Sequence, residues 1–380
     1  MLVTRRILEI GAIIVALGLF AVMGQRLLGA DGLLLADGNP VFGDFMAFWS
    51  AGRVALEGQA AFVHQPPVVQ EVQWNEVPGM RWVATWNSPP HFLLIASALA
   101  LLPYPVAALT WLGATGALYL GAALKLLGDK RALVFALTAP AALYHLGSIQ
   151  TGLYIAGVTG LALYWLDKRP LTAGALVGLL AIKPHMAVLW PLYLVLTQRW
   201  RAFFAAAASL ALFTLAAILA FGWESIPRFL ANLSATQDLI DLQQVNRATY
   251  ASLYGNLLAM GAPAAIAMNV HIVSALAAIG AAALVFLRGD ARTQGAALCA
   301  ATLLTTPYGF FYDQTLSLVA IALLAPPRGR FEFVAFILAW SAGLSLAVAA
   351  QGLTLPICPV ANWLVLAAAL LRTARQARAG

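Results

Sequence analysis

The chain has 380 residues, of which 62% are hydrophobic and only 10% are charged, whereas an ordinary soluble domain carries about 25% charged residues. This composition excludes a water-soluble globule, because the surface of a globule needs polar cover. The net charge of +7 does not indicate nucleic-acid binding, since the basic residues lie in short clusters between apolar runs, as in cytoplasmic loops of membrane proteins. The sequence therefore predicts an all-α integral membrane protein.

The first apolar run covers residues 7–25 and follows Arg5 and Arg6. It is long enough to cross a hydrocarbon core about 30 Å thick. No small-residue cleavage site follows it convincingly, so we expect a retained first helix that starts on the cytoplasmic side. Residues 26–104 then form the predicted first external loop. Its apolar run 91–102 is too short for a comfortable crossing, and we expect it to lie in the outer leaflet as an interfacial helix.

The rest of the chain alternates between apolar runs and short polar segments, apart from a second large external loop at 222–263. We predict about twelve crossings in one domain, residues 1–380, with both termini inside. Several of these runs are near 15 residues, and we expect them to be tilted or broken. The predicted crossings are 7–25, 105–127, 132–147, 153–166, 171–183, 185–198, 202–221, 264–287, 294–306, 314–325, 331–350 and 360–371.

The distribution of charge agrees with this topology. Of the 22 Lys and Arg residues, 16 fall in the predicted cytoplasmic segments, whereas ten of the 15 Asp and Glu residues fall in the predicted external ones. This is the basic bias that orients membrane proteins. We therefore expect the two large external loops to lie on the extracytoplasmic side of the plasma (inner) membrane.

The strongest local motif is GDFMAFWSAGR at residues 43–53. Its apolar residues mark one face of a helix, and Gly58 suits the end of that helix. Asp44 stands where the helix starts, so its carboxylate could cap the first turn. Alternatively, Asp44 could be a general base held at the membrane surface, within reach of an acceptor hydroxyl.

This motif resembles the signature that follows the first helix in glycosyltransferase family 87, whose members are polyprenol-phosphate-mannose-dependent mannosyltransferases of the GT-C fold. Each further motif is short, and the resemblance depends on their order and spacing over residues 40–325. One departure is Ser88, where relatives often have Tyr. The other matching motifs are NSPPHFL at 87–93, GSIQTG at 147–152, AIKPH at 181–185 and TPY followed by YD at 306–313.

The resemblance implies that Asp44 is the catalytic base and that the donor is a polyprenyl-phosphate hexose, most often mannose. Lys183 and His185 lie between two apolar runs, where a charge is costly and therefore suggests a functional site. Lys183 could also be a snorkelling lysine. The functional alternative is that these cations stabilise the departing lipid phosphate.

Two arginines of the second external loop compete for the same role, because the forked donors of Arg suit phosphate. We rank Arg247 above Arg228, since Tyr250 and Tyr254 lie nearby and could stack on a sugar or lipid. Either arginine could equally be a solvated loop charge.

Gln150, Tyr312 and Asp313 also lie on the external side of the predicted topology, and we include them among the residues that contact the donor phosphate or sugar. Each has a structural alternative. A buried Gln commonly satisfies neighbouring backbone groups, and Asp313 could orient Lys183 or cap a helix. The tryptophans 74, 82 and 86 are expected to be interfacial anchors.

These features predict a membrane hexosyltransferase that moves a sugar, with inversion, from a polyprenyl-phosphate donor to a hydroxyl of a glycan or glycolipid acceptor. No P-loop, dinucleotide motif or zinc spacing is present in a supporting context, and we expect neither a cofactor nor a required metal. The alternative is a transporter or lipid-linked-sugar flippase, which would more often show internal repeats and interrupted helices.

Overall fold

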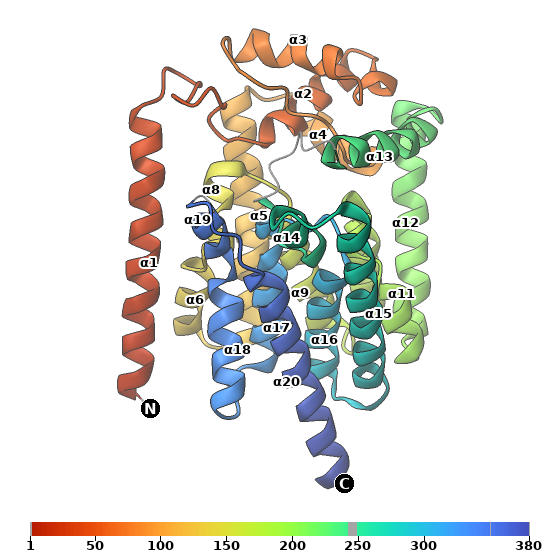
Figure 1. Ribbon diagram of the computed structural model, residues 1–380. Coiled ribbons are helices and arrows are strands. Elements are labelled where there is room, and N and C mark those ends of the chain that lie inside the picture. The colour runs from red at the N-terminus through yellow and green to blue at the C-terminus, as the bar shows by residue number, and fades with distance from the viewer. Residues whose placement is uncertain (1, 242–248, 350, 380) are drawn as a thin grey trace.

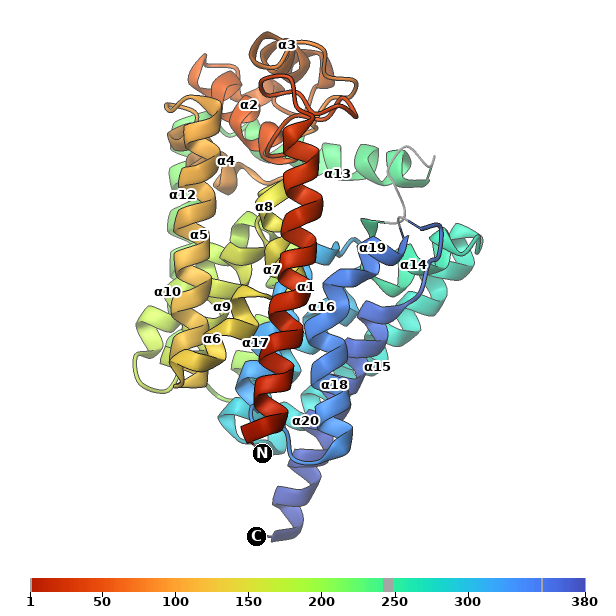
Figure 2. The same cartoon turned by 90° about the vertical axis from the view of Figure 1, so that its left-hand side faces the viewer.

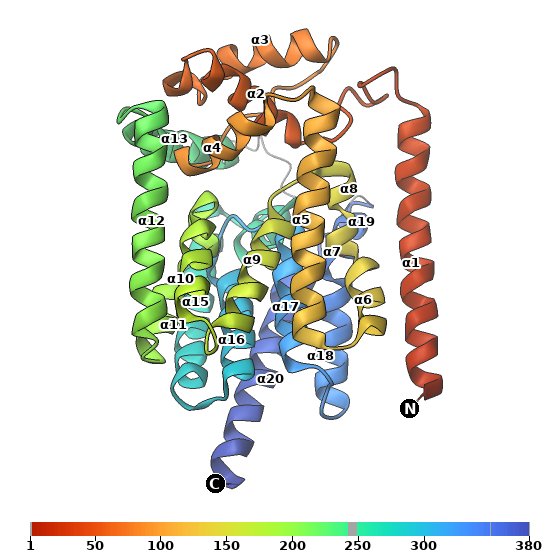
Figure 3. The same cartoon turned by 180° about the vertical axis from the view of Figure 1, so that it is seen from behind.

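The computed structural model describes residues 2–241, 249–349 and 351–379, and it is built from helices. Figures 1–3 show a bundle of roughly parallel helices with a group of short helices, α2, α3, α4 and α13, across one end, which we call the cap end. The α-helices of the first half are α1 (Leu2–Leu28), α2 (Phe45–Leu56), α3 (Pro66–Glu76), α4 (Pro90–Leu99), α5 (Tyr104–Leu127), α6 (Leu133–Leu137), α7 (Pro140–Leu143), α8 (His145–Ser148), α9 (Gly152–Trp165), α10 (Pro170–Leu179) and α11 (Trp190–Leu196).

The second half completes the bundle, and short 3₁₀ turns connect several of its helices. Among them, η3 (Leu180–Ile182), η4 (Pro184–Met186) and η6 (Phe311–Gln314) carry predicted site residues. The α-helices are α12 (Trp200–Phe221), α13 (Ser225–Asp241), α14 (Leu253–Ala259), α15 (Ala264–Arg288), α16 (Ala291–Thr305), α17 (Thr315–Leu324), α18 (Arg330–Ser341), α19 (Ser345–Ala349) and α20 (Ile357–Ala379).

The prediction of a helical membrane protein is confirmed. Six helical segments among the described residues are long and apolar enough to cross a bilayer. Of the shorter apolar helices, Pro90–Leu99 coincides with the predicted interfacial helix, and the others coincide with predicted crossings. The total of twelve crossings, the orientation and the GT-C fold remain predictions. The six segments are Arg6–Leu28, Tyr104–Leu127, Trp200–Phe221, Ala264–Arg288, Arg330–Ala349 and Ile357–Arg378.

Two of the shorter runs differ from a straight crossing in the expected ways. The run 132–147 is broken into α6, α7 and α8, because Pro140 cannot continue a helix that starts before it and instead opens α7. α4 has only ten residues and is therefore about 15 Å long. That length is too short for a crossing, in agreement with the prediction for residues 91–102.

The termini and the cap end lie at opposite ends of the molecule (Figures 1–3): the first turn of α1 and the last turn of α20 both lie away from α2 and α3. Residues 26–104 therefore belong to the end opposite the Arg-rich C-terminal helix. This arrangement is compatible with the predicted topology, in which the two termini share one side of the membrane.

The cap end is held by aromatic packing between α2 and the segments around it. Phe48 packs against Phe92 of α4 with ring centroids 4.7 Å apart, and Trp86 stacks on Phe92 at 5.4 Å. The prediction that Trp86 is an interfacial anchor is wrong, because this side chain is buried in that cluster. Trp82 is half-buried and donates to Asn39.

Close contact between α2 and α4 fixes the position of α2. Gly52 of α2 lies so near the backbone of α4 that a Cβ atom there would collide with the Ala96 carbonyl oxygen and come within 2.6 Å of its carbon. The end of α2 also follows the sequence prediction, since Gly58 adopts a left-handed φ of +78° just beyond it. The start of α2, where Asp44 lies, is thereby held against the bundle.

We predict that Gly52→Ala destabilises the protein by about 2 kcal/mol, because the added methyl group overpacks the α2–α4 contact. Gly113→Ala in α5 is the matched control, since nothing lies within 4 Å of its added Cβ and Ala favours a helix over Gly. Thermal unfolding in detergent, followed by the loss of the monodisperse chromatographic peak, measures both. Equal unfolding temperatures for the two variants would contradict the packing argument.

Candidate functional site

Segments from four distant parts of the sequence meet beneath α2. They are the turn before α2, the α8–α9 connection, the η3–η4 junction and η6. A hydrogen bond between Gln150 and Asp44 joins the α8–α9 connection to the turn before α2. Another, between Lys183 and Asp313, joins the η3–η4 junction to η6. The charge of Lys183 also acts on Asp44, which relates the two pairs. The structure thus brings together five of the predicted site residues, the fifth being Tyr312.

Asp44 occupies the N-cap position of α2, but its side chain makes no capping hydrogen bond. The first amides of the helix are satisfied by main-chain carbonyls instead, since Phe45 N donates to Phe42 O and Met46 N to Gly43 O, each at 3.2 Å. The carboxylate is free for another partner, and its Oδ2 accepts a 2.8 Å hydrogen bond from Gln150 Nε2. The capping alternative for Asp44 is therefore wrong.

Backbone contact between two motifs places Asp44 beside Gln150. Gly43 has φ +51° and lies against the α8–α9 connection, so that a Cβ atom would come within 2.9 Å of the Gly147 carbonyl oxygen and 3.1 Å of Ser148 Cα. On the other side of the contact, Ile149 takes a left-handed φ of +45° and ends α8. Glycine at 43 is needed both for its conformation and for this close approach.

The electrostatic environment of Asp44 favours a carboxylate that holds a proton more tightly than usual. Burial raises its pKa, while the hydrogen bond from Gln150 and the positive charge of Lys183 act in the opposite direction; the net direction is upward. The side chain nevertheless keeps partial solvent access. Asp44 is thus a desolvated carboxylate that a hydroxyl group could approach.

Asp313 differs from Asp44 because its partner is a cation. Lys183 Nζ lies 2.5 Å from Asp313 Oδ1, and the two side chains are only 12% and 1% exposed. The other carboxylate oxygen accepts from Phe310 N at 3.0 Å. Lys183 therefore does not snorkel toward an interface. The structure shows both structural alternatives for Asp313, since one carboxylate oxygen orients Lys183 and the other caps the start of η6.

Tyr312 is the centre of an aromatic column. Lys183 Nζ lies 4.6 Å from its ring centroid, in cation–π geometry. Its ring stacks on Phe310 at 5.3 Å and on Tyr144 at 6.2 Å, and Phe310 in turn stacks on Tyr250 at 4.8 Å. The column connects the end of the second predicted external loop to the Lys183–Asp313 pair. The sequence analysis missed Tyr144, which no recognised motif contains.

His145 was also missed, and it explains the second glycine of the 147–152 motif. Its Nδ1 donates to Ala141 O at 3.0 Å and its Nε2 accepts from Leu153 N at 3.2 Å, which fixes the tautomer. A Cβ atom at Gly152 would collide with the Tyr312 carbonyl oxygen and come within 2.6 Å of this Nε2. His145 and Gly152 therefore hold η6 against the start of α9.

Two other predicted cations, His185 and Arg228, make no hydrogen bond to this cluster within the described residues. The imidazole of His185 is exposed and makes no hydrogen bond within the described residues, although its carbonyl oxygen accepts from Thr306 at 3.5 Å. Arg228 lies over Phe62 at 5.0 Å, on the side of the first predicted loop. Arg247 lies outside the described residues.

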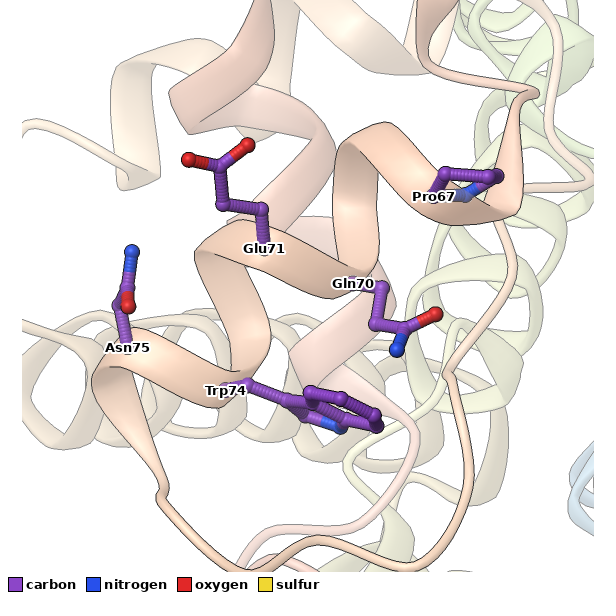
Figure 4. A pocket seen from close by; sticks show the side chains of 5 residues that line it. All are labelled: Pro67, Gln70, Glu71, Trp74 and Asn75. Atoms are coloured by element: carbon purple, nitrogen blue, oxygen red, sulfur yellow. The ribbon is translucent and has the colours of Figure 1, made fainter.

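Among the described residues, neither a metal-binding cluster nor one of the two best-formed pockets lies at the site. Within the part of the chain that the structure describes, no group of three or more His, Cys, Asp or Glu side chains could hold a metal ion. A shallow surface pocket of about 350 Å³ lies on α3 instead, and Figure 4 shows the side chains that line it. Trp74 in this pocket is 46% exposed. None of the residues that line this pocket is a predicted site residue. They are Pro67, Gln70, Glu71, Trp74 and Asn75.

We predict that Asp313→Asn destabilises the protein by about 3 kcal/mol, because it leaves the Lys183 ammonium in a buried position without its anionic partner. Lys183→Met together with Asp313→Asn should cost less than the sum of the two single changes, since the pair is then removed as a unit. Denaturation midpoints of the two single variants and the double variant in detergent measure the coupling. Additive effects would show that the ion pair contributes nothing to stability.

Comparison with known proteins assigns the chain to a family. The family model for glycosyltransferase family 87 matches residues 86–307, more than half of the chain. The matched region includes Gln150, Lys183 and His185, whereas Asp44, Tyr312 and Asp313 lie outside it. No curated protein and no solved structure matches the chain. The family match agrees with the resemblance seen in the motifs, and the chain belongs to glycosyltransferase family 87.

Proposed function

We propose that this glycosyltransferase moves a hexose, most often mannose in the family it resembles, from a polyprenyl-phosphate donor to a hydroxyl group of a glycan or glycolipid, with Asp44 as the general base. The observation that carries the proposal is the difference between the two carboxylates of the site. Asp313 is neutralised by a lysine, whereas Asp44 has an uncharged amide as its hydrogen-bond partner. Two carboxylates in such different environments can take different chemical roles.

Asp44 has the properties that a general base needs. Its Oδ2 is hydrogen-bonded to Gln150, and its Oδ1 has no hydrogen-bond partner within the described residues, which leaves that oxygen for an acceptor hydroxyl. Desolvation raises the pKa of Asp44 above its ordinary value, and this makes its ionised form a stronger base. Partial solvent access provides a route for the acceptor.

Lys183 suits the phosphate of the donor. A lysine ammonium has three N–H donors, and within the described residues Lys183 uses one of them, toward Asp313. The other two can donate to phosphate oxygens that gain charge in the transition state. Asp313 and Tyr312 hold the ammonium in place. His185 and Arg247 are the further proposed phosphate ligands.

The proposed reaction is a single displacement. The acceptor O–H bond breaks and its proton passes to Asp44, while the acceptor oxygen forms a bond to the anomeric carbon. The bond between that carbon and the phosphate oxygen breaks, and the polyprenyl phosphate leaves with the electron pair beside Lys183. One displacement inverts the anomeric centre, and a monophosphate leaving group needs no metal.

The donor would reach the site sideways from the outer leaflet of the plasma membrane, so that transfer takes place on the extracytoplasmic side. The position of α2 at the end opposite both termini supports this orientation (Figure 1). Family membership favours sugar transfer over the alternative of a transporter or flippase.

We predict that Asp44→Asn lowers the rate of sugar transfer at least 100-fold, because an amide cannot accept the acceptor proton and general-base catalysis contributes about 10²–10⁴. Membranes that contain the protein are supplied with radiolabelled polyprenyl-phosphate mannose, and label in glycan and glycolipid products is measured. The matched control is Asp37→Asn, which removes an exposed carboxylate of the same loop that is paired with Arg26 at 2.6 Å.

The Asp37 variant should transfer sugar within about twofold of the wild-type rate, since an exposed ion pair contributes little to structure. Wild-type transfer by a folded Asp44→Asn protein would overturn the proposed function. Transport of the lipid-linked sugar across proteoliposomes, without any covalent product, would favour the transporter instead.

A further inference from the structure

We infer that Gln150 is a positioning residue for Asp44: its side-chain amide holds one carboxylate oxygen so that the other is presented to the acceptor. This role differs from the donor contact expected for Gln150 from the sequence. It rests on the proposed function of Asp44, and it adds a second residue to the acid–base half of the site.

The direction of the hydrogen bond is determined by chemistry. An ionised carboxylate only accepts hydrogen bonds, so Gln150 must turn its NH₂ group toward Asp44 Oδ2, at 2.8 Å. The amide oxygen of Gln150 then points to a separate position and has no hydrogen-bond partner within the described residues. This amide group is therefore committed to the base, rather than to the backbone around it.

The backbone holds Gln150 as firmly as it holds Asp44. Gln150 follows Ile149, whose left-handed φ of +45° turns the chain out of α8, and it precedes Gly152, which is wedged against η6. The close approach of Gly43 to the Gly147 carbonyl connects the two partners through main chain alone. The distance between amide and carboxylate is thus set by rigid contacts on both sides, as a preorganised site requires.

Among the described residues, few other groups act on Asp44, and this makes the role of Gln150 measurable. Lys183 of the η3–η4 junction is the nearby cation, and it is already paired with Asp313. Among the described residues, the other titratable groups that interact with Asp44 are the phenols of Tyr104 in α5, Tyr144 next to α8 and Tyr312 in η6. Phenols are neutral at acid and neutral pH, so they do not change charge over the acid limb of the pH profile.

Two substitutions of Gln150 should move the pH dependence in opposite directions. Gln150→Met keeps the length of the side chain but removes the donor that favours the ionised carboxylate. The Asp44 pKa then rises, and the acid limb of the pH profile moves up by about half a unit. Gln150→Lys replaces the amide with a cation, which favours the ionised form and moves the limb down by about one unit.

The rate of transfer from polyprenyl-phosphate mannose is measured between pH 5 and 9, with kcat and the donor KM at each pH. For Gln150→Met we expect kcat to fall about tenfold at neutral pH, because Asp44 is no longer held in place. The donor KM should stay within about twofold. Gln59→Met and Gln59→Lys are matched controls at an exposed residue of the loop after α2, and they should leave both the limb and kcat unchanged.

A Gln150→Met protein with the wild-type acid limb would overturn the inference, as would a raised donor KM at unchanged kcat. The second result would make Gln150 a donor ligand. If the Gln150→Lys variant does not fold, the position of the acid limb in the pH profile of the Gln150→Met variant is sufficient for the test. The inference and the proposed function can fail separately. An active Asp44→Asn protein would overturn the proposed function, whereas the results for Gln150→Met would overturn only the inference.

Discussion

Every ionisable side chain that enters the end of a membrane bundle loses water, and it must find a partner there. This constraint shapes the site beneath α2. The two carboxylates meet it differently, since Asp313 takes a lysine and Asp44 takes an amide. The pairing of Asp313 with Lys183 neutralises the carboxylate and fixes the Lys183 ammonium, a hydrogen-bond donor, in place. The other pairing gives Asp44 only an uncharged amide as its hydrogen-bond partner, which suits the general base that we propose.

The two halves of the site depend on close backbone contacts that only glycine permits. Gly43 lets the turn before α2 approach the α8–α9 connection, and Gly152 lets η6 approach the start of α9. Gly52 holds α2 itself against α4. In this chain the short motifs therefore combine packing with polar contacts: a glycine allows the close backbone approach, and the polar residue near it is placed at the site.

The sequence was informative where a pattern is local, and it was silent where contacts are distant. Hydropathy predicts the helical membrane class and the short helix at α4, and the motif at 43–53 predicts both α2 and the importance of Asp44. Local spacing could not exclude a cap at Asp44, because the side-chain partner of Asp44 is Gln150, 106 residues away. The partner of Lys183 is 130 residues away. His145 gave no signal either. Its hydrogen-bond partners, Ala141 and Leu153, are close in sequence, but both contribute backbone atoms, which no residue pattern marks.

A structure of the protein with a non-hydrolysable polyprenyl-phosphate sugar bound would test the central claim most directly. The account predicts the donor phosphate within hydrogen-bonding distance of Lys183 and the anomeric carbon on the side that faces Asp44, with room for one hydroxyl between them. A phosphate bound elsewhere, with Asp44 still closed onto Gln150 and remote from the sugar, would contradict the assignment of Asp44 as the base.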